Sequence, residues 1–201
     1  MPGGGRVMVR AARLIGEAPV TARETLYADW METPLGPMLA VGDSTHLHRL
    51  EFHDHEELVC EMNGLRRRTH APVLAGRTAP IEQIDGELRA YFAGESVDFR
   101  TPLHLAGSAF ERAVWEKLLE VPLGETCSYG DIARAVDTLQ AVRAVARANG
   151  SNCIPIVIPC HRCIGSDGSL TGYGGGLWRK QWLLRHEGRM RPVGLFAEER
   201  L

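Results

Sequence analysis

The sequence has no long uninterrupted apolar run. Charged and polar residues break every hydrophobic segment before the roughly 20 residues that cross a bilayer, so we expect no membrane-spanning helix. The N-terminal stretch is interrupted by Arg6, Arg10 and Arg13 and lacks the apolar core of a secretory signal. We expect residues 1–24 to form a flexible tail. A transit peptide is the alternative, because these arginines precede any acidic residue.

Cysteine is infrequent, and its distribution excludes a disulfide framework. The five cysteines are odd in number and irregularly spaced, whereas small secreted domains use even, regularly placed sets. We therefore expect a reduced protein in the cytoplasm. Four histidines crowd one segment, and we expect them to decorate solvent-facing strand positions rather than to bind a metal. They are His46, His48, His53 and His55.

The chain also has no internal repeat and no phosphate-binding motif of the form GxxxxGK(S/T). With 201 residues, 44% of them hydrophobic and 24% charged, it has the composition of one globular domain or two small ones. The net charge is only −2. Acidic residues outnumber basic ones in residues 1–100 and the reverse holds in residues 101–201, so the C-terminal half is where a polyanion would dock.

The first half predicts a small α/β domain over residues 25–100. Short runs of alternating hydrophobicity, separated by "TPLGP" and "GDST", are typical of a three-stranded meander. The segment "IEQIDGELRAYFAG" places its apolar residues on one helical face and ends at Gly94. We interpret "ESVDFRTPLHLAG" as a last strand followed by a linker.

The second half begins with helix-capping patterns. Ser108 with Glu111, and Ser128 with Asp131, have the spacing of a capping box. A further helix is predicted over residues 139–149, capped by the preceding "DT". Two short helices joined by a tight turn indicate a helix-turn-helix.

The predicted fold class is therefore α+β. A mostly helical domain over residues 101–190 follows the small α/β domain, and a final amphipathic helix ends at Gly188. Residues 191–201 are expected to form a second tail. The glycine-rich segment "GSDGSLTGYGGG" before the final helix predicts a loop.

The stretch "IVIPCHRCIG" contains the most informative cysteine, Cys160. After an apolar strand over residues 156–158, a cysteine is commonly an inert small hydrophobe. However, cationic neighbours lower a thiol pKa and favour the reactive thiolate, and His161 and Arg162 follow directly. Adjacent side chains in a strand face opposite ways, so a Cys160–His161 partnership requires the chain to leave the strand at Pro159.

Cys160 and Cys163 also form a CxxC motif, which leaves a zinc site and a thioredoxin-type redox site as alternatives. Zinc requires a second ligand pair, but the remaining cysteines come singly. A thioredoxin-type motif follows the first strand of its fold and opens a long helix, whereas this one follows a helix-turn-helix. The single cysteines are Cys60, Cys127 and Cys153.

The second helix of the predicted helix-turn-helix is basic and rich in small residues. Arg143 and Arg147 are i,i+4 neighbours, and no acidic residue lies between positions 138 and 151. Spacing alone permits two interpretations, an alanine-rich core helix with two solvated arginines or a helix that closely approaches another surface.

From Ser108 to Gly188 the sequence resembles the C-terminal domain of the O6-alkylguanine-DNA alkyltransferases, also called methylated-DNA–protein-cysteine methyltransferases. The resemblance is carried by "PCHR" preceded by "PIVI", by Asn152 upstream, by "SYGDIA", and by "HEG" with Glu187. Residues 25–100 resemble the family's N-terminal domain only in "TPLGPMLAV" and in position.

The resemblance implies a single-turnover DNA repair reaction. Cys160 would accept an alkyl group from O6-alkylguanine, and from O4-alkylthymine, while His161 takes its proton through a bridging water and Glu187 orients the histidine. Asn152 would tie the helix-turn-helix to the strand that holds the cysteine. Tyr129 would donate a hydrogen bond to the guanine ring as negative charge develops. No cofactor and no metal are implied.

It also implies how DNA is engaged. Double-stranded DNA would bind through its minor groove, independently of sequence, to a monomeric protein, and Arg143 would fill the stack vacated by the extruded base. Further DNA contacts would come from Tyr129, Ala144, Arg147 and Gly150. The base pocket would be formed by Tyr173, Gly174, Gly175 and Arg162.

Three positions depart from the family pattern. Cys153 replaces a common proline, Cys163 replaces an aliphatic residue, and Gly174 replaces a common serine, which would widen the pocket for larger alkyl groups. No cysteine-rich N-terminal zinc module is present, so a transcriptional role is not expected. Two other functions remain open, a helix-turn-helix protein with a structural cysteine and a cysteine hydrolase that uses Cys160, His161 and Glu187.

Overall fold

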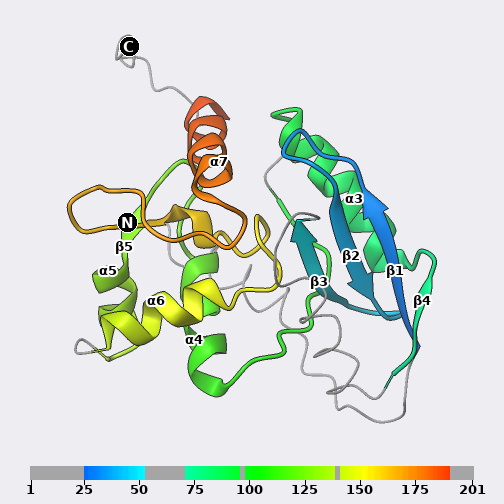
Figure 1. Ribbon diagram of the computed structural model, residues 1–201, viewed down its shortest axis with the longest axis horizontal. Coiled ribbons are helices and arrows are strands. Elements are labelled where there is room, and N and C mark those ends of the chain that lie inside the picture. Colours follow the sequence, from blue (N-terminus) through cyan, green and yellow to red (C-terminus); the bar gives the residue numbers. More distant parts are fainter. Residues whose placement is uncertain (1–24, 53–70, 96–97, 139–140, 191–201) are drawn as a thin grey trace, which may run out of the picture.

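The structure is a computed structural model, and it describes residues 25–52, 71–95, 98–138 and 141–190. Both predicted tails lie outside these residues. The fold class is α+β, as predicted: a small sheet with one helix is followed by a helical half (Figure 1). No helix in the described ranges is both long and apolar enough to span a membrane.

The predicted three-stranded meander is confirmed, and a fourth strand extends it. Neighbouring β1, β2 and β3 pair antiparallel, and the short β4 pairs parallel with β1, so the order is β3-β2-β1-β4. The fourth strand was not predicted because it has only three residues, two of them exposed. The bounds are Leu26–Met31 for β1, Met38–Gly42 for β2, Leu47–Phe52 for β3 and Val73–Ala75 for β4.

Helix α3 (Ala79–Phe92) covers one face of this sheet (Figure 1). Its buried side is the predicted apolar face, including Ile81, Leu88 and Tyr91. The helix ends where predicted, because Gly94 has a φ of 77° that other residues rarely adopt. Tyr91 is only 1% exposed although its ring ends in a hydroxyl, so that hydroxyl requires a buried partner.

Strand β3 is the sheet edge that faces the helical half (Figure 1), and all six of its residues are buried. Its Leu50 amide donates to the Cys153 carbonyl at 2.9 Å, and Leu47 bonds to the backbone of residues 102–104. The last strand predicted within residues 95–107 is therefore wrong for the part that is described. Within that segment only Leu103 pairs with the sheet, through one isolated bridge to Leu47.

The prediction that the histidines face solvent is wrong for His48, while His53 and His55 lie outside the described residues. His48 is 7% exposed, it contacts the Asp43 carboxylate at 2.6 Å, and its ring stacks on His104. Both faces of β3 are covered, so alternation along the strand does not expose every second side chain.

The helical half contains α4 (Ala109–Leu119), α5 (Tyr129–Ala135), α6 (Val142–Gly150) and α7 (Leu177–Met190). Both predicted capping boxes are confirmed, since the hydroxyls of Ser108 and Ser128 each accept from the amide three residues ahead. Helix α7 continues past Gly188 to Met190, so its predicted end is wrong. A helix-interior glycine costs only about 1 kcal/mol, and packing of the helix outweighs it.

Helices α5 and α6 form the predicted helix-turn-helix. The predicted cap of α6 is wrong, because the helix begins at Val142 after Ala141, which provides no side-chain cap. Packing holds α6 instead: the buried Trp115 indole of α4 donates to the Ala148 carbonyl at 2.7 Å. One hydrophobic core joins both halves, from Phe52 through Trp115 to Leu183.

Candidate active site

The chain reaches Cys160 through a turn, and the predicted strand over residues 156–158 is wrong. The Ile158 amide donates to the Ile154 carbonyl at 3.0 Å, and Ile156 has a φ of 73°. A β-branched residue rarely adopts that conformation, which costs about 1–3 kcal/mol. Pro155 and Pro159 lack amide hydrogens and bracket this segment, so neither of its flanking positions can donate to a strand ladder.

Pro159 redirects the chain, as the sequence required. Its φ of −80° and ψ of 59°, with a 2.8 Å bond from the Cys160 amide to the Ile158 carbonyl, form an inverse γ-turn. Cys160 then opens the 3-10 helix η1 (Cys160–Arg162). Successive side chains of such a helix diverge by about 120°, so Cys160 and His161 face different surroundings without the constraint of a strand.

Asn152 holds the Cys160 sulfur directly. Its Nδ2 donates to Cys160 Sγ at 3.1 Å and to the Ile158 carbonyl at 2.9 Å. Asn149, which the sequence did not single out, donates from α6 to the Cys160 carbonyl at 3.4 Å. The two asparagines thus join the helix-turn-helix to the turn that carries the cysteine.

Cys160 rests as a neutral thiol. It is 5% exposed, and this burial raises its pKa to about 11, although the Asn152 hydrogen bond acts in the opposite direction. The prediction that His161 and Arg162 lower this pKa is therefore wrong for the resting protein. The Arg162 guanidinium instead forms an ion pair with the Glu187 carboxylate.

His161 and Glu187 form a buried pair, and both side chains are 0% exposed. His161 Nε2 lies 2.8 Å from Glu187 Oε1. Burial lowers the pKa of His161, whereas hydrogen bonds from His161 and Arg162 outweigh burial and hold the pKa of Glu187 well below its ordinary value. Because an ionised carboxylate only accepts, Nε2 carries the proton and Nδ1 is the basic nitrogen. Nδ1 has no hydrogen-bond partner among the described residues.

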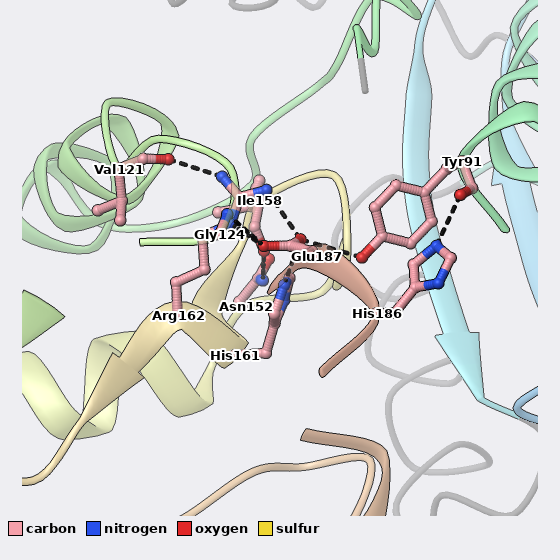
Figure 2. A network of polar contacts seen from close by, with 9 residues as sticks. All are labelled: Tyr91, Val121, Gly124, Asn152, Ile158, His161, Arg162, His186 and Glu187. Carbon is pink, nitrogen blue, oxygen red and sulfur yellow. Dashed lines mark hydrogen bonds and ion pairs between the residues drawn. The ribbon is translucent and has the colours of Figure 1, made fainter. Parts of the chain in front are cut away.

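Arg162 supports Glu187 and does not line the pocket, which corrects its predicted place. Its Nε donates to Glu187 Oε2 at 2.7 Å and its Nη2 to Oε1 at 2.8 Å. Its Nη1 donates to the Val121 carbonyl at 2.6 Å. This two-pronged contact fixes the carboxylate plane and balances its charge (Figure 2).

Tyr91 completes the network from the other half of the chain. Its hydroxyl donates to Glu187 Oε1 at 3.0 Å, and its own carbonyl contacts the His186 ring at 2.8 Å (Figure 2). The sequence placed Tyr91 on an apolar helix face and gave no signal for this role, because the contact joins residues far apart in the chain.

A cavity of about 410 Å³, including the space at its mouth, opens beside Cys160. The predicted pocket residues Tyr173, Gly174 and Gly175 line it, and so does Gly150, which was predicted to contact DNA. Strand β3 contributes two residues that the sequence did not indicate. The full lining is Glu51, Phe52, Asn149, Gly150, Asn152, Pro155, Cys160, Tyr173, Gly174 and Gly175.

Two further residues fix the loop that forms the cavity wall. The buried Lys180 ammonium donates to the carbonyls of Cys163 at 2.6 Å and Thr171 at 2.7 Å. Tyr129, at the start of α5, donates its hydroxyl to the same Thr171 carbonyl at 3.3 Å. Tyr129 is thus beside the loop but does not itself line the cavity in this conformation. A buried lysine has no local sequence signal, and Lys180 was missed for that reason.

Helix α6 presents a basic surface. Arg143, Arg147 and Gly150 are exposed, Ala144 is half-buried, and Val145 faces the core. Within the described ranges, no three histidine, cysteine or acidic side chains gather as metal ligands. The structure thus places the Cys160 thiol at a cavity, a buried imidazole at the next position in the chain, and a helix with exposed arginines in the same half.

Comparison with known proteins places this arrangement in a family. Residues 109–189 match the profile described as "6-O-methylguanine DNA methyltransferase, DNA binding domain", and residues 23–105 match "6-O-methylguanine DNA methyltransferase, ribonuclease-like domain". The chain belongs to this methyltransferase family. It is 40% identical over 165 residues to the methylated-DNA–protein-cysteine methyltransferase of Shigella flexneri, covering 81% of this chain and 96% of that protein.

Further relatives and solved structures of the same family are also similar to this chain. The methylated-DNA–protein-cysteine methyltransferase of Mycolicibacterium paratuberculosis is 43% identical over 168 residues, covering 82% of this chain and 94% of the relative. A crystal structure of Mycobacterium tuberculosis O6-methylguanine methyltransferase superposes with a TM-score of 0.71 at 38% identity, covering 85% of this chain and 98% of that one. A structure of the Mycobacterium tuberculosis protein OGT in complex with DNA matches with the same TM-score and identity, covering 83% and 96%.

Proposed function

We propose that this chain repairs alkylated DNA by transferring the alkyl group of O6-alkylguanine, and of O4-alkylthymine, irreversibly to Cys160. The observation that carries the proposal is the position of Cys160 Sγ beside a cavity, bonded to Asn152, with the His161–Glu187 pair next to it in the chain. Each molecule acts once, because the thioether that forms is not hydrolysed.

The thiol must lose its proton for the reaction to begin. A bridging water carries the Cys160 proton to His161 Nδ1, and the Glu187 carboxylate stabilises the imidazolium that results. The thiolate attacks the alkyl carbon, so that a sulfur–carbon bond forms as the carbon–O6 bond breaks. The electron pair moves into the guanine ring, where the Tyr129 hydroxyl, freed from Thr171, donates a hydrogen bond.

A neutral resting thiol suits this sequence of events. Burial keeps the pKa of Cys160 high, so the thiolate forms only when His161 takes the proton beside the bound base. Arg162 and Tyr91 hold Glu187, and they act on the reaction only through that carboxylate.

The target oxygen lies inside a stacked duplex, so the base must be extruded at a cost of a few kcal/mol. Helix α6 would approach the minor groove of double-stranded DNA independently of sequence, with Arg143 in the vacated stack and Ala144, Arg147 and Gly150 against the backbone. Tyr173, Gly174 and Gly175 would wall the extruded base. We further propose a monomer, an intracellular location, no cofactor, and domains over residues 25–100 and 101–190.

Intact-mass spectrometry after incubation with O6-methylguanine duplex DNA tests the reaction. We expect a gain of one methyl group per molecule that is absent from Cys160→Ala. Binding without a change in mass would indicate a helix-turn-helix protein with a structural cysteine. Turnover of an ester or amide substrate without permanent methylation would indicate a hydrolase.

A further inference from the structure

Two further cysteines, Cys127 and Cys163, form a pair in the same half of the chain as Cys160. Cys127 in β5 (Cys127–Ser128) and Cys163 in β6 (Cys163–Ile164) are direct partners in a parallel two-stranded ladder. Adjacent strands lie about 4.8 Å apart, which falls within the Cα separation of about 4.4–6.8 Å that a disulfide bridges. Both are free cysteines.

The two thiols differ in reactivity. The hydrogen bond from the Cys163 thiol lowers the pKa of Cys127 despite burial, and the Lys180 ammonium adds to this effect. Cys163 is 0% exposed and its pKa is raised, so it keeps its proton. Cys127 is only half-buried, so an oxidant can reach it, and a lowered pKa increases the fraction of the reactive thiolate form.

We propose that Cys127 and Cys163 form a reversible disulfide on exposure to a peroxide, a modification site separate from Cys160. The Cys127 thiolate attacks the peroxide, the oxygen–oxygen bond breaks, and a sulfenic acid forms. The Cys163 thiol then displaces water from that sulfenic acid. In total two thiols and one hydrogen peroxide give one disulfide and two waters, and Cys160 is not consumed. A dithiol reductant reverses the reaction.

The bond would close the part of the chain that carries the chemistry. It would link residue 127, before α5, to residue 163, after η1, and the loop between them contains the helix-turn-helix, Asn152 and Cys160. Closing a loop of this size restricts the unfolded chain, so the oxidised protein melts several degrees higher. Lys180 connects the same strand to the pocket loop through the Cys163 and Thr171 carbonyls.

The full-length protein is treated with hydrogen peroxide, its remaining thiols are blocked in denaturant, and the peptides are mapped. We expect a crosslink between the peptides of Cys127 and Cys163, a loss of two hydrogens, and reversal by dithiothreitol. The melting temperature should rise on oxidation. Cys127→Ser and, in case that variant folds poorly, Cys163→Val should lose both changes, whereas Cys153→Ala should keep them.

The readout does not depend on DNA repair, so the proposal and the alkyltransferase function can fail separately. The oxidised protein should still present Cys160 as a free thiol in the map. A crosslink that includes Cys160, or oxygenation of Cys160 while Cys127 and Cys163 stay free, would each overturn the proposal.

Discussion

The hydroxyl of Tyr91 donates to the same Glu187 oxygen that accepts from His161, at 3.0 Å and 2.8 Å respectively. Tyr91 belongs to α3, which packs on the N-terminal sheet, and Glu187 belongs to the last helix. The N-terminal half therefore supplies a hydroxyl to the polar network around Glu187 (Figure 2). Its sheet edge also supplies Glu51 and Phe52 to the cavity.

Replacing Tyr91 with phenylalanine removes that hydroxyl and keeps the packed ring. We expect alkyl transfer to slow about two- to tenfold, which corresponds to the ~0.5–1.5 kcal/mol of one hydrogen bond. Single-turnover kinetics on methylated duplex DNA measure this, and DNA affinity should not change. Tyr27→Phe, on β1 and outside the network, is the matched control. Equal rates for Tyr91→Phe and the wild type would exclude a positioning role for Tyr91.

Local patterns predicted much of the fold correctly. Both capping boxes, the apolar face of α3 and its end at Gly94 depend on residues within a few positions of each other, and the structure confirms them. The predictions were wrong where contacts between residues far apart in the chain determine burial or the end of a helix. His48 is buried because the helical half covers an edge strand, and Gly188 stays helical because α7 packs along the core.

The high pKa of Cys160 predicts unusual thiol chemistry. Because burial raises that pKa to about 11, the thiolate fraction of the free protein should grow about tenfold per pH unit through the neutral and mildly alkaline range. Mass mapping of iodoacetamide labelling over pH measures this for each cysteine. In denaturant the same cysteine should level off near its ordinary pKa of about 8.5. A plateau at that pH in the folded protein would contradict the prediction.

Glu187 should contribute stability that depends on pH. Its pKa is depressed in the folded protein, so its contribution is present above the unfolded pKa of about 4.3 and is lost as pH falls toward the folded value. Glu187→Gln leaves the buried Arg162 charge without its counter-ion, and we expect a cost of about 3–5 kcal/mol near pH 7. Urea unfolding of both proteins should show this difference shrinking below about pH 4. A difference that is constant with pH would contradict the assignment of the charge.

Helix α6 should matter for duplex DNA and not for the chemistry itself. Arg143→Ala should slow transfer from methylated duplex by about tenfold or more, because extrusion of the base costs a few kcal/mol. Transfer from the free base O6-benzylguanine, which needs no extrusion, should keep its rate. Arg89 is also an exposed arginine, but it lies on α3, away from α6. Arg89→Ala is therefore the control and should change neither rate. An equal loss on both substrates would place Arg143 in the chemical step.

The site residues were harder to anticipate than the helices. The roles proposed for Cys160, His161 and Glu187 rest on the resemblance, whereas the surroundings of these residues depend on how the chain folds back on itself. The prolines around residues 156–158 produce a turn where β-branched residues favoured a strand, and Arg162 turns toward Glu187 rather than toward the pocket. Neither the three-dimensional partner of an arginine nor the burial of Lys180 is encoded by neighbouring residues.

The pocket wall should set the range of alkyl groups. Gly174 lines the cavity with no side chain, at a position where the resemblance implies a serine, so we expect this chain to accept bulky groups readily. Gly174→Ser adds a side chain with a hydroxyl donor to the cavity wall and so reduces the space in the cavity. Its transfer rate from O6-benzylguanine should fall relative to that from O6-methylguanine in DNA, by about fivefold for ~1 kcal/mol of lost contact. Gly174→Ala separates the two effects, because it reduces the space without adding a donor. If all three proteins show the same ratio of rates, Gly174 does not set the preference.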